Sequence, residues 1–264
     1  MSRQPDSPVL PGEHDTLREI AERLLASESA VAFTGAGIST ESGIPDFRSP
    51  GGVWSRNKPV MYDEFLADPD ARARYWAMKR EVYHDFSNAE PNSGHLLLAR
   101  LEEEGRLKGV ITQNIDGLHQ RAGSKNVLEL HGTNLEAACV SCAWRCPIKD
   151  AHSQMETGRD VPVCPECEGW LKPATVSFGQ SLPQDVMMES QRLAQEADLF
   201  FAIGSSLVVY PAAGLPEAAR RSGAFLAIFN REETPLDGVA NATIRTPIGS
   251  AFEALFGLYQ QRRD

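Results

Sequence analysis

The sequence predicts an α/β fold, in which a doubly wound parallel (Rossmann-like) sheet carries a smaller inserted lobe. Five short runs of near-continuous apolar residues are followed closely by Gly, Asn or Ser, and segments with helical apolar spacing separate most of them. Strands buried on both faces of a parallel sheet have this composition, and helices alternate with them along the chain. The five runs are residues 30–33, 110–112, 127–130, 199–203 and 225–229.

Two helices can be placed from their apolar spacing. The apolar residues between 17 and 25 recur at helical intervals, and Asp15 before them is a candidate N-cap. The clearest helix covers residues 92–104, with Asn92 or Ser93 as its cap and Gly105 at its end.

Two stretches interrupt the alternation of strands and helices. Residues 46–90 have helical patterns without a strand, and residues 133–175 contain all five cysteines. We therefore expect three units: a Rossmann-like domain, a loop with a helical insert, and a cysteine-containing module. Their bounds are 12–45, 91–132 and 176–264 for the first, 46–90 for the second and 133–175 for the third.

Length and charge limit the class of protein. A chain of 264 residues accommodates one large domain or a main domain with an insert. The net charge of −10 argues against nucleic acid as a partner, because phosphate binding needs clustered Lys and Arg. The most apolar stretch, residues 200–215, is too short and too interrupted to span a membrane. Residues 1–11 have no apolar core of a signal peptide, so we expect a cytoplasmic protein.

A glycine loop, Gly35-Ala36-Gly37-Ile38-Ser39, directly follows the first predicted strand. Glycines in this place allow a tight turn and a close approach of backbone N–H groups to a pyrophosphate. The third glycine of the dinucleotide fingerprint is replaced by Thr40, so a plain turn is an alternative. No acidic residue ends a second strand about 20 residues further on, as a dehydrogenase needs for the ribose, and hydride transfer is disfavoured.

Polar side chains follow the second and third predicted strands. Gln113, Asn114 and Asp116 can bind an amide, a ribose and an ordered water, or they can form an Asx turn that begins the next helix. His131 ends the third strand and can act as a general base, although a single histidine is more often structural. We expect His119 to be structural.

The cysteines form two pairs, Cys139-x-x-Cys142 and Cys164-x-x-Cys167. Four thiolates in tetrahedral geometry suit zinc and leave no open position, so the metal is expected to be structural. Unligated core cysteines are the alternative interpretation. Cys146 is the fifth cysteine and could replace Cys142 as a ligand.

These segments together resemble the sirtuin (Sir2) family of NAD-dependent protein deacylases, of the bacterial type. The resemblance runs from about Val31 to the C-terminal helix and rests on motifs that occur in the same order. The motifs are GAGIS at 35–39, GIPDFRSPGGVW at 43–54, TQNID at 112–116, LHG at 130–132, the paired cysteines, VSFGQSLP at 176–183 and GSSLVVYP at 204–211.

The resemblance implies a role for each motif. The residues implied to bind the pyrophosphate and the flexible cofactor loop are Gly35, Ala36, Gly37, Ser39, Phe47 and Arg48. Those implied for the ribose and nicotinamide are Gln113, Asn114, Ile115 and Asp116, and those for the adenosine side are Gly204, Ser205, Ser206, Asn230 and Glu232. Val176, Phe178 and Gly179 would pair with the substrate peptide by strand addition.

The implied reaction is removal of an acyl group, most often acetyl, from lysine side chains of proteins or peptides. The acyl oxygen attacks the ribose carbon of NAD, and His131 takes a proton from a ribose hydroxyl, assisted by Asn114 and Asp116. Lysine, nicotinamide and an O-acyl-ADP-ribose are the products. The implied cofactors are NAD, as a co-substrate, and one structural zinc.

One departure from the family concerns the acyl group. Members selective for succinyl-lysine carry a Tyr-x-x-Arg pair that binds the acyl carboxylate, and the corresponding positions here are assigned to Trp76 and Lys79, next to Tyr75. Lys lacks the bidentate fork of Arg, so we expect a preference for neutral acyl groups, acetyl first.

Two other functions are compatible with the same cofactor. A protein mono-ADP-ribosyltransferase would use the same bound NAD, and a non-catalytic NAD-sensing module would only bind it. The intact His131, Asn114 and Asp116 favour an enzyme over a sensor, because binding alone needs no base.

Overall fold

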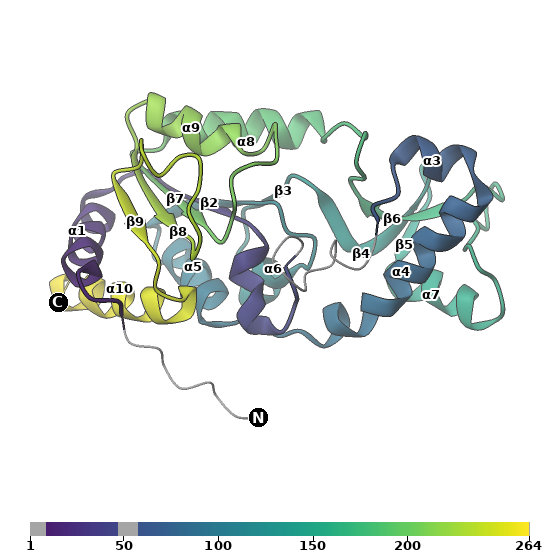
Figure 1. Ribbon diagram of the computed structural model, residues 1–264, viewed down its shortest axis with the longest axis horizontal. Coiled ribbons are helices and arrows are strands. Elements are labelled where there is room, and N and C mark those ends of the chain that lie inside the picture. Colours follow the sequence, from purple (N-terminus) through teal and green to yellow (C-terminus); the bar gives the residue numbers. More distant parts are fainter. Residues whose placement is uncertain (1–8, 47–57, 264) are drawn as a thin grey trace.

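A computed structural model describes residues 9–46 and 58–263 of the chain. The molecule is elongated and has two lobes, with a six-stranded sheet in the larger lobe and a three-stranded sheet in the smaller one (Figure 1). The larger lobe contains both the first and the last helix, so the smaller lobe is built from internal segments of the chain.

The large sheet is parallel throughout, with the strand order β3-β2-β1-β7-β8-β9. Every residue of the three central strands β1, β7 and β8 is buried, which explains their continuous apolar sequences. The strands are β1 Ala30–Thr34, β2 Leu107–Thr112, β3 Val127–Glu129, β7 Leu199–Ile203, β8 Phe225–Phe229 and β9 Ala242–Ile244. The predicted doubly wound sheet is therefore confirmed.

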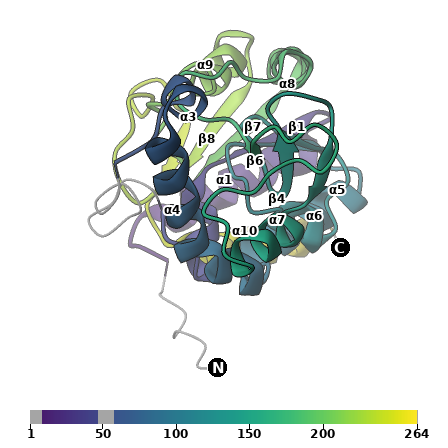
Figure 2. The same ribbon diagram turned by 90° about the vertical axis from the view of Figure 1, so that its right-hand side faces the viewer.

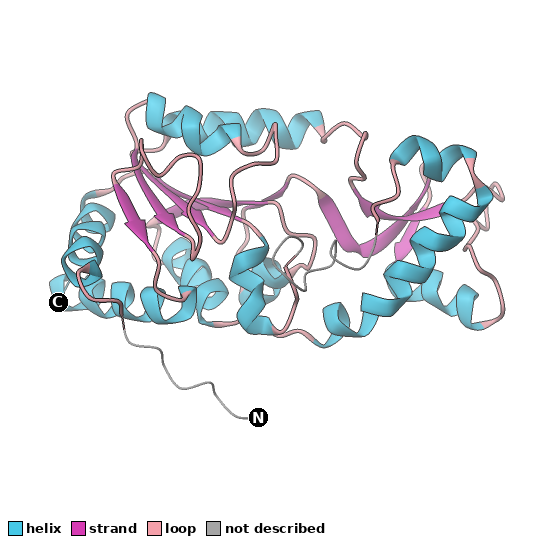
Figure 3. Ribbon diagram, viewed as in Figure 1, coloured by secondary structure: helices cyan, strands magenta, loops and turns pink. Residues whose placement is uncertain are grey.

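Helices cover both faces of this sheet (Figure 3). One face is covered by α1 (Glu13–Ala26), α5 (Ser93–Glu103) and α10 (Ile248–Arg263), whose buried residues form one apolar cluster with the sheet. The opposite face is covered by α8 (Gln184–Glu196) and α9 (Gly214–Arg221), which form a second cluster. Two separate cores on the two faces of one sheet are typical of a doubly wound fold.

The helix caps agree with the sequence in one case and differ in the other. Asn92 caps α5, because its Oδ1 accepts hydrogen bonds from the backbone N–H groups of Gly94 and His95. The prediction that Asp15 caps α1 is wrong: α1 begins at Glu13, after Gly12 in a left-handed conformation. Asp15 lies in the first turn, where a carboxylate also stabilises a helix.

The smaller lobe packs helices against an antiparallel sheet of order β5-β4-β6 (Figure 2). Its strands are β4 Gly132–Cys139, β5 Arg145–Pro147 and β6 Leu171–Thr175, and its helices are α3 Tyr62–Ala67, α4 Pro69–Asn88 and α7 Ile148–Glu156. Residues from both inserted segments share one apolar cluster, in which the side chain of Trp76 is fully buried.

Two short helices follow strands of the large sheet: η1 (Ala36–Ser42) follows β1, and α6 (Leu118–Ala122) follows the loop after β2. Within the part of the chain that the structure describes, no helix is long and apolar enough to cross a membrane.

Candidate cofactor and substrate site

A cavity of about 1040 Å³ is lined by residues of both lobes. The larger lobe contributes the segments that follow β1, β2, β7, β8 and β9, and the smaller lobe contributes residues of α4 and the segment after β6. The carboxyl ends of parallel strands are where doubly wound folds bind ligands. The cavity is therefore the candidate functional site.

The loops after β1 and β7 meet at the centre of the sheet, where the strand order reverses direction. The backbone N–H of Gly35 donates to Ile203 O (2.9 Å), and that of Gly37 donates to Gly204 O (2.8 Å). A Cβ atom on Gly37 would lie 2.7 Å from the Cα atom of Gly204, which leaves no room for a side chain. The glycines are thus required by the close approach of two cavity-lining loops, and a plain turn does not explain them.

Gly35, Ala36, Gly37, Gly204, Ser205 and Ser206 all line the cavity. These small residues leave little side-chain bulk on this part of the cavity wall, which suits the approach of a pyrophosphate to the backbone. Phe47 and Arg48, also predicted for the cofactor, lie outside the described residues.

The polar loop after β2 joins the cavity wall to a buried hydrogen-bond chain. Asn114 Nδ2 donates to Ser39 Oγ (3.1 Å), and Ser39 Oγ donates to Asp116 Oδ2 (2.7 Å). Asp116 Oδ1 also accepts from the N–H of Leu118 (3.0 Å), which is the Asx turn that the sequence left as an alternative. Burial raises the pKa of Asp116. Asn114 lines the cavity, and Ser39 and Asp116 hold its side chain from behind.

The other residues of this loop also lie at the cavity. Gln113 and Ile115 line it, and Gln113 Nε2 donates to Ser205 Oγ (2.7 Å). This contact links the loop after β2 to the loop after β7. Asn230 and Glu232, which follow β8, line the same cavity.

His131 lines the cavity between β3 and β4. Its Nδ1 lies 2.9 Å from the carbonyl oxygen of Gln113. A carbonyl can only accept, so Nδ1 carries the proton and Nε2 is the basic nitrogen of the neutral ring. This arrangement fixes the tautomer that a general base needs.

Two further histidines lie in the interior of the larger lobe, away from the cavity wall. His119 Nε2 is 2.9 Å from Thr34 Oγ1, and the ring of His95 packs against that of His119 with centroids 4.9 Å apart. Burial lowers the pKa of His95 to about 4 and that of His119 to about 3. Both are therefore neutral at physiological pH, in agreement with a structural role for His119.

The smaller lobe presents Tyr75, Met78 and Lys79 of α4 to the cavity. The prediction that Trp76 occupies the acyl-contacting position is wrong. Trp76 faces the core of the lobe, and its Nε1 donates to Leu171 O (2.9 Å). Residues 75, 78 and 79 share one face of a helix, and residue 76 points elsewhere.

Polar and cationic groups approach Tyr75 on one side, while its ring packs edge-on against Phe65. Its hydroxyl lies 3.3 Å from Thr175 Oγ1, and the ammonium groups of Lys79 and Lys172 lie 5.6 and 5.8 Å from the ring centroid. Burial alone would raise the pKa of Tyr75, but the two lysines and the hydrogen bond outweigh burial and lower it to about 8.

The segment predicted to bind a peptide lies along the cavity. Val176, Phe178 and Gly179 line it, and the Phe178 side chain is 41% exposed. The N–H of Val176 donates to His131 O (2.8 Å), and Phe178 O accepts from the N–H of Tyr62 (2.9 Å). These two backbone groups already have partners, so added pairing with a peptide would use other groups of the segment.

Four cysteines of the smaller lobe converge. The Sγ atoms of Cys139, Cys142, Cys164 and Cys167 all lie within 4.8 Å of one another, and three of the separations are 3.5–3.7 Å. Zinc–sulfur bonds of about 2.3 Å in tetrahedral geometry separate the sulfurs by about 3.8 Å. The donor set and its spacing therefore fit a structural zinc. Cys146 lies outside this group, paired with Ala137 in the β4–β5 ladder.

Sequence reasoning missed several lining residues. Thr246, Pro247 and Ile248 follow β9, a strand of three residues with Thr243 at its centre, which produces no apolar run. Tyr75 and Met78 lie in a helix whose aromatic and apolar residues occur on both faces, so the spacing did not show which face points to the cavity.

Comparisons with known proteins agree on one family. The sequence model of the Sir2 family matches residues 35–211. An NAD-dependent protein deacetylase of Rhodopseudomonas palustris is 45% identical over 251 residues, which cover 94% of this chain and 99% of that protein. The NAD-dependent protein deacetylase of Thermotoga maritima is 45% identical over 226 residues, covering 85% and 90%.

Solved structures give the same picture. A complex of Sir2 with a p53 peptide and NAD+ is similar with a TM-score of 0.84 at 42% identity, covering 94% of this chain and 98% of that one. A Sir2 bound to an acetylated peptide is similar with a TM-score of 0.82 at 40% identity, covering 94% and 98%.

Proposed function

The chain belongs to the Sir2 family, and from this premise we propose that it is an NAD-dependent protein-lysine deacetylase. With NAD and one water molecule, it converts acetyl-lysine to lysine and releases nicotinamide and O-acetyl-ADP-ribose. One observation carries the proposal: a single cavity contains the two glycine loops at the sheet centre, the polar loop after β2 and His131.

The NAD site is supported by the backbone arrangement. We assign the pyrophosphate to the loops of Gly35–Gly37 and 204–206, and the adenosine end to Asn230 and Glu232. Gln113, Asn114 and Ile115 take the ribose and the nicotinamide, and Ser39 and Asp116 hold Asn114 in place. NAD supplies the ADP-ribose to which the acetyl group is transferred.

His131 is assigned as the general base. Its Nδ1–H donates to Gln113 O, so Nε2 accepts the proton from a ribose hydroxyl. The same hydrogen bond fixes the orientation of the His131 ring, because its acceptor, Gln113 O, belongs to the loop assigned to the ribose. Asn114 and Asp116 are linked through Ser39, because the Asp116 carboxylate accepts from the Ser39 hydroxyl and that hydroxyl accepts from the Asn114 amide.

The acetylated lysine enters beside the segment of Val176, Phe178 and Gly179. Sir2 complexes with acetylated and propionylated peptides support a protein or peptide as the partner. Tyr75, Met78 and Lys79 lie at the same cavity and are candidates to contact the acyl group. Acetyl remains the proposed preference.

Two further assignments belong to this proposal. Residues 12–45, 91–132 and 176–264 form the NAD-binding domain, with the cofactor loop and helical insert at 46–90 and the zinc module at 133–175; the separate large and small sheets support this division. Four closely spaced thiolates suit a reducing compartment, which supports a cytoplasmic location.

A nicotinamide-release assay tests the proposal. The wild-type protein should release nicotinamide from NAD when an acetyl-lysine peptide is present and little without it. Absence of release under both conditions would favour an NAD-sensing module. Release together with a mass gain on an unacetylated target protein would favour a mono-ADP-ribosyltransferase.

A further inference from the structure

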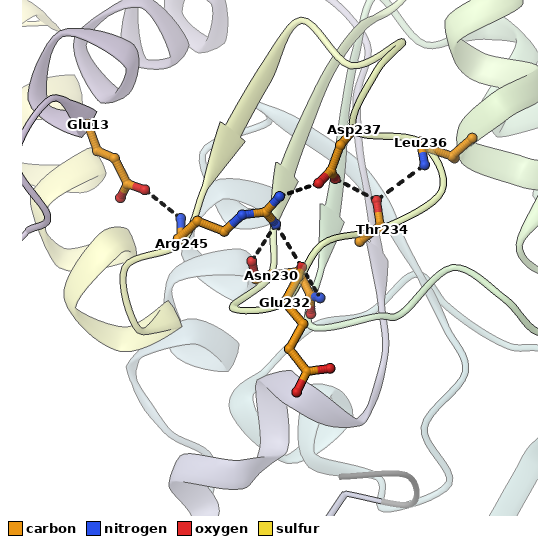
Figure 4. Close-up of polar contacts among 7 residues, drawn as sticks. All are labelled: Glu13, Asn230, Glu232, Thr234, Leu236, Asp237 and Arg245. Carbon is orange, nitrogen blue, oxygen red and sulfur yellow. Dashed lines mark hydrogen bonds and ion pairs between the residues drawn. The ribbon is translucent and has the colours of Figure 1, made fainter.

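Arg245 follows β9 and holds the loop that follows β8 (Figure 4). Its Nη1 donates to the backbone carbonyls of Asn230 (2.8 Å) and Glu232 (2.7 Å), and its Nη2 binds the carboxylate of Asp237. One planar guanidinium therefore connects three points of the loop 230–237.

The loop is also closed by its own side chains. Asn230 Nδ2 donates to Glu232 O (2.9 Å), and Thr234 Oγ1 donates to Asp237 Oδ1 (2.7 Å). Asn230 and Glu232 line the cavity, and the Glu232 carboxylate points away from Arg245 (Figure 4). Arg245 thus binds the backbone carbonyl of Glu232, and between these two residues, both of which the structure describes, no contact holds the Glu232 carboxylate.

A second set of contacts anchors Arg245 itself. Glu13, the first residue of α1, accepts from the backbone N–H of Arg245 (2.6 Å) and from the N–H and hydroxyl of Thr246 (3.1 and 2.6 Å). Thr246 lines the cavity. The first turn of α1 therefore fixes the segment from which both Arg245 and this part of the cavity wall arise.

The Arg245–Asp237 pair contributes geometry rather than net charge. The side chains are 25% and 23% exposed, and the two opposite charges compensate each other. Burial opposes ionisation of Asp237, but hydrogen bonds from Thr234 and the pairing with Arg245 outweigh it and lower its pKa. Asp237 is consequently a carboxylate at neutral pH.

We propose that Arg245 is a positioning residue for the adenosine half of NAD, because it fixes the backbone that presents Asn230 and Glu232 to the cavity. This inference rests on the proposed function, which places adenosine at these residues. Lys cannot replace Arg fully, since one ammonium does not bridge two carbonyls and a carboxylate with a fixed planar geometry.

The test compares Arg245→Ala and Arg245→Lys with Arg220→Ala as a matched control. Arg220 also binds a backbone carbonyl of the segment after β8, that of Val239 (2.9 Å), but it is not part of the cavity wall. Calorimetry measures the Kd of NAD and of ADP-ribose, and steady-state assays measure kcat and both KM values.

Arg245→Ala should raise the Kd of NAD and of ADP-ribose by the same factor, about tenfold, equivalent to about 1.4 kcal/mol. It should raise the KM for NAD similarly, leave the KM for the acetylated peptide unchanged, and keep kcat at saturating NAD within about twofold. Arg245→Lys should recover part of the affinity, and Arg220→Ala should match the wild type.

A folded Arg245→Ala protein with wild-type Kd values, or with a lower kcat and an unchanged KM for NAD, would overturn the inference. If that variant does not fold, Asp237→Asn tests the same contact and should raise both Kd values by a smaller factor; unchanged values would again overturn it. A wild-type protein that binds neither NAD nor ADP-ribose would instead refute the proposed function.

Discussion

Tyr75 lines the cavity and has a pKa well below that of an ordinary tyrosine. Burial opposes ionisation, but Lys79, Lys172 and hydrogen bonds stabilise the phenolate and bring the pKa to about 8, whereas ordinary tyrosines titrate at about 10. The chain has five tyrosines, so one of them should titrate separately from the rest. We expect a tyrosinate absorbance step near pH 8 that is absent in Tyr75→Phe.

Two variants check the cause of this shift. Tyr210→Phe removes a tyrosine that is 66% exposed and should keep the step near pH 8. Lys79→Gln removes one of the two cations and should move the step to higher pH. A step that stays at pH 8 in Lys79→Gln would show that the lysine is not responsible.

His119 should make the protein sensitive to mild acid. Its folded pKa of about 3 lies below the value of about 6.5 in an unfolded chain, so below pH 6.5 the unfolded state binds a proton that the folded state does not. The free energy of unfolding should therefore fall as the pH falls. One such histidine accounts for a loss of about 2 kcal/mol between pH 6.5 and pH 5.

Urea unfolding at several pH values measures this loss. His119→Gln should have a smaller pH slope than the wild type over the same range, whatever its stability at pH 7. The raised pKa of Asp116 acts in the opposite direction in both proteins, because its protonated form is favoured in the fold. Equal slopes for variant and wild type would contradict the assignment of a neutral, buried His119.

Among the elements, the two cysteine pairs of the smaller lobe give the clearest prediction. Cys142→Ser should abolish stoichiometric zinc and lower the melting temperature by on the order of 10 °C, because a structural zinc contributes several kcal/mol to folding. Cys146→Ser is the matched control, since Cys146 lies in the same lobe but outside the cluster. Cys146→Ser should retain one zinc per chain. Loss of zinc from Cys146→Ser but not from Cys142→Ser would show that the ligand set is wrong.

An element could be predicted from the sequence where its residues formed a clear apolar run. The central strands β1, β7 and β8 are buried on both faces, so their apolar runs marked them directly. β9 is an edge strand of three residues and left no such run, so it and the residues after it were missed. Arg245 was not predicted as a functional residue, because it directly follows β9.

Helix α4 shows a different limit. Tyr75 and Trp76 are adjacent, large and both buried, so the spacing alone could not decide which of them faces the core. In the structure, the Trp76 indole is buried in the core of the smaller lobe and donates to Leu171 O, and Tyr75 on the adjacent face lines the cavity. The motif residues that line the cavity lie in loops after strands, where position along the chain already indicates the ligand-binding edge of a parallel sheet.

At the scale of the whole molecule, the two lobes share the cavity. The larger lobe provides the glycine loops, the polar loop and His131, and the smaller lobe provides Tyr75 and its neighbours on α4. The segment after β6 runs from the small sheet along the cavity to α8 of the large lobe. A peptide at this segment would therefore lie between the lobes, at the cavity that His131 and Tyr75 also line.

The decisive measurement of the proposed deacetylation is mass spectrometry of an acetyl-lysine peptide incubated with NAD and either the wild type or His131→Ala. The wild type should remove the acetyl group only when NAD is present and produce one O-acetyl-ADP-ribose for each peptide deacetylated. His131→Ala should bind NAD but leave the peptide acetylated. An acetyl group that stays on the peptide with the wild type would contradict the proposed deacetylation, and equal loss with His131→Ala would contradict the role of His131 as the base.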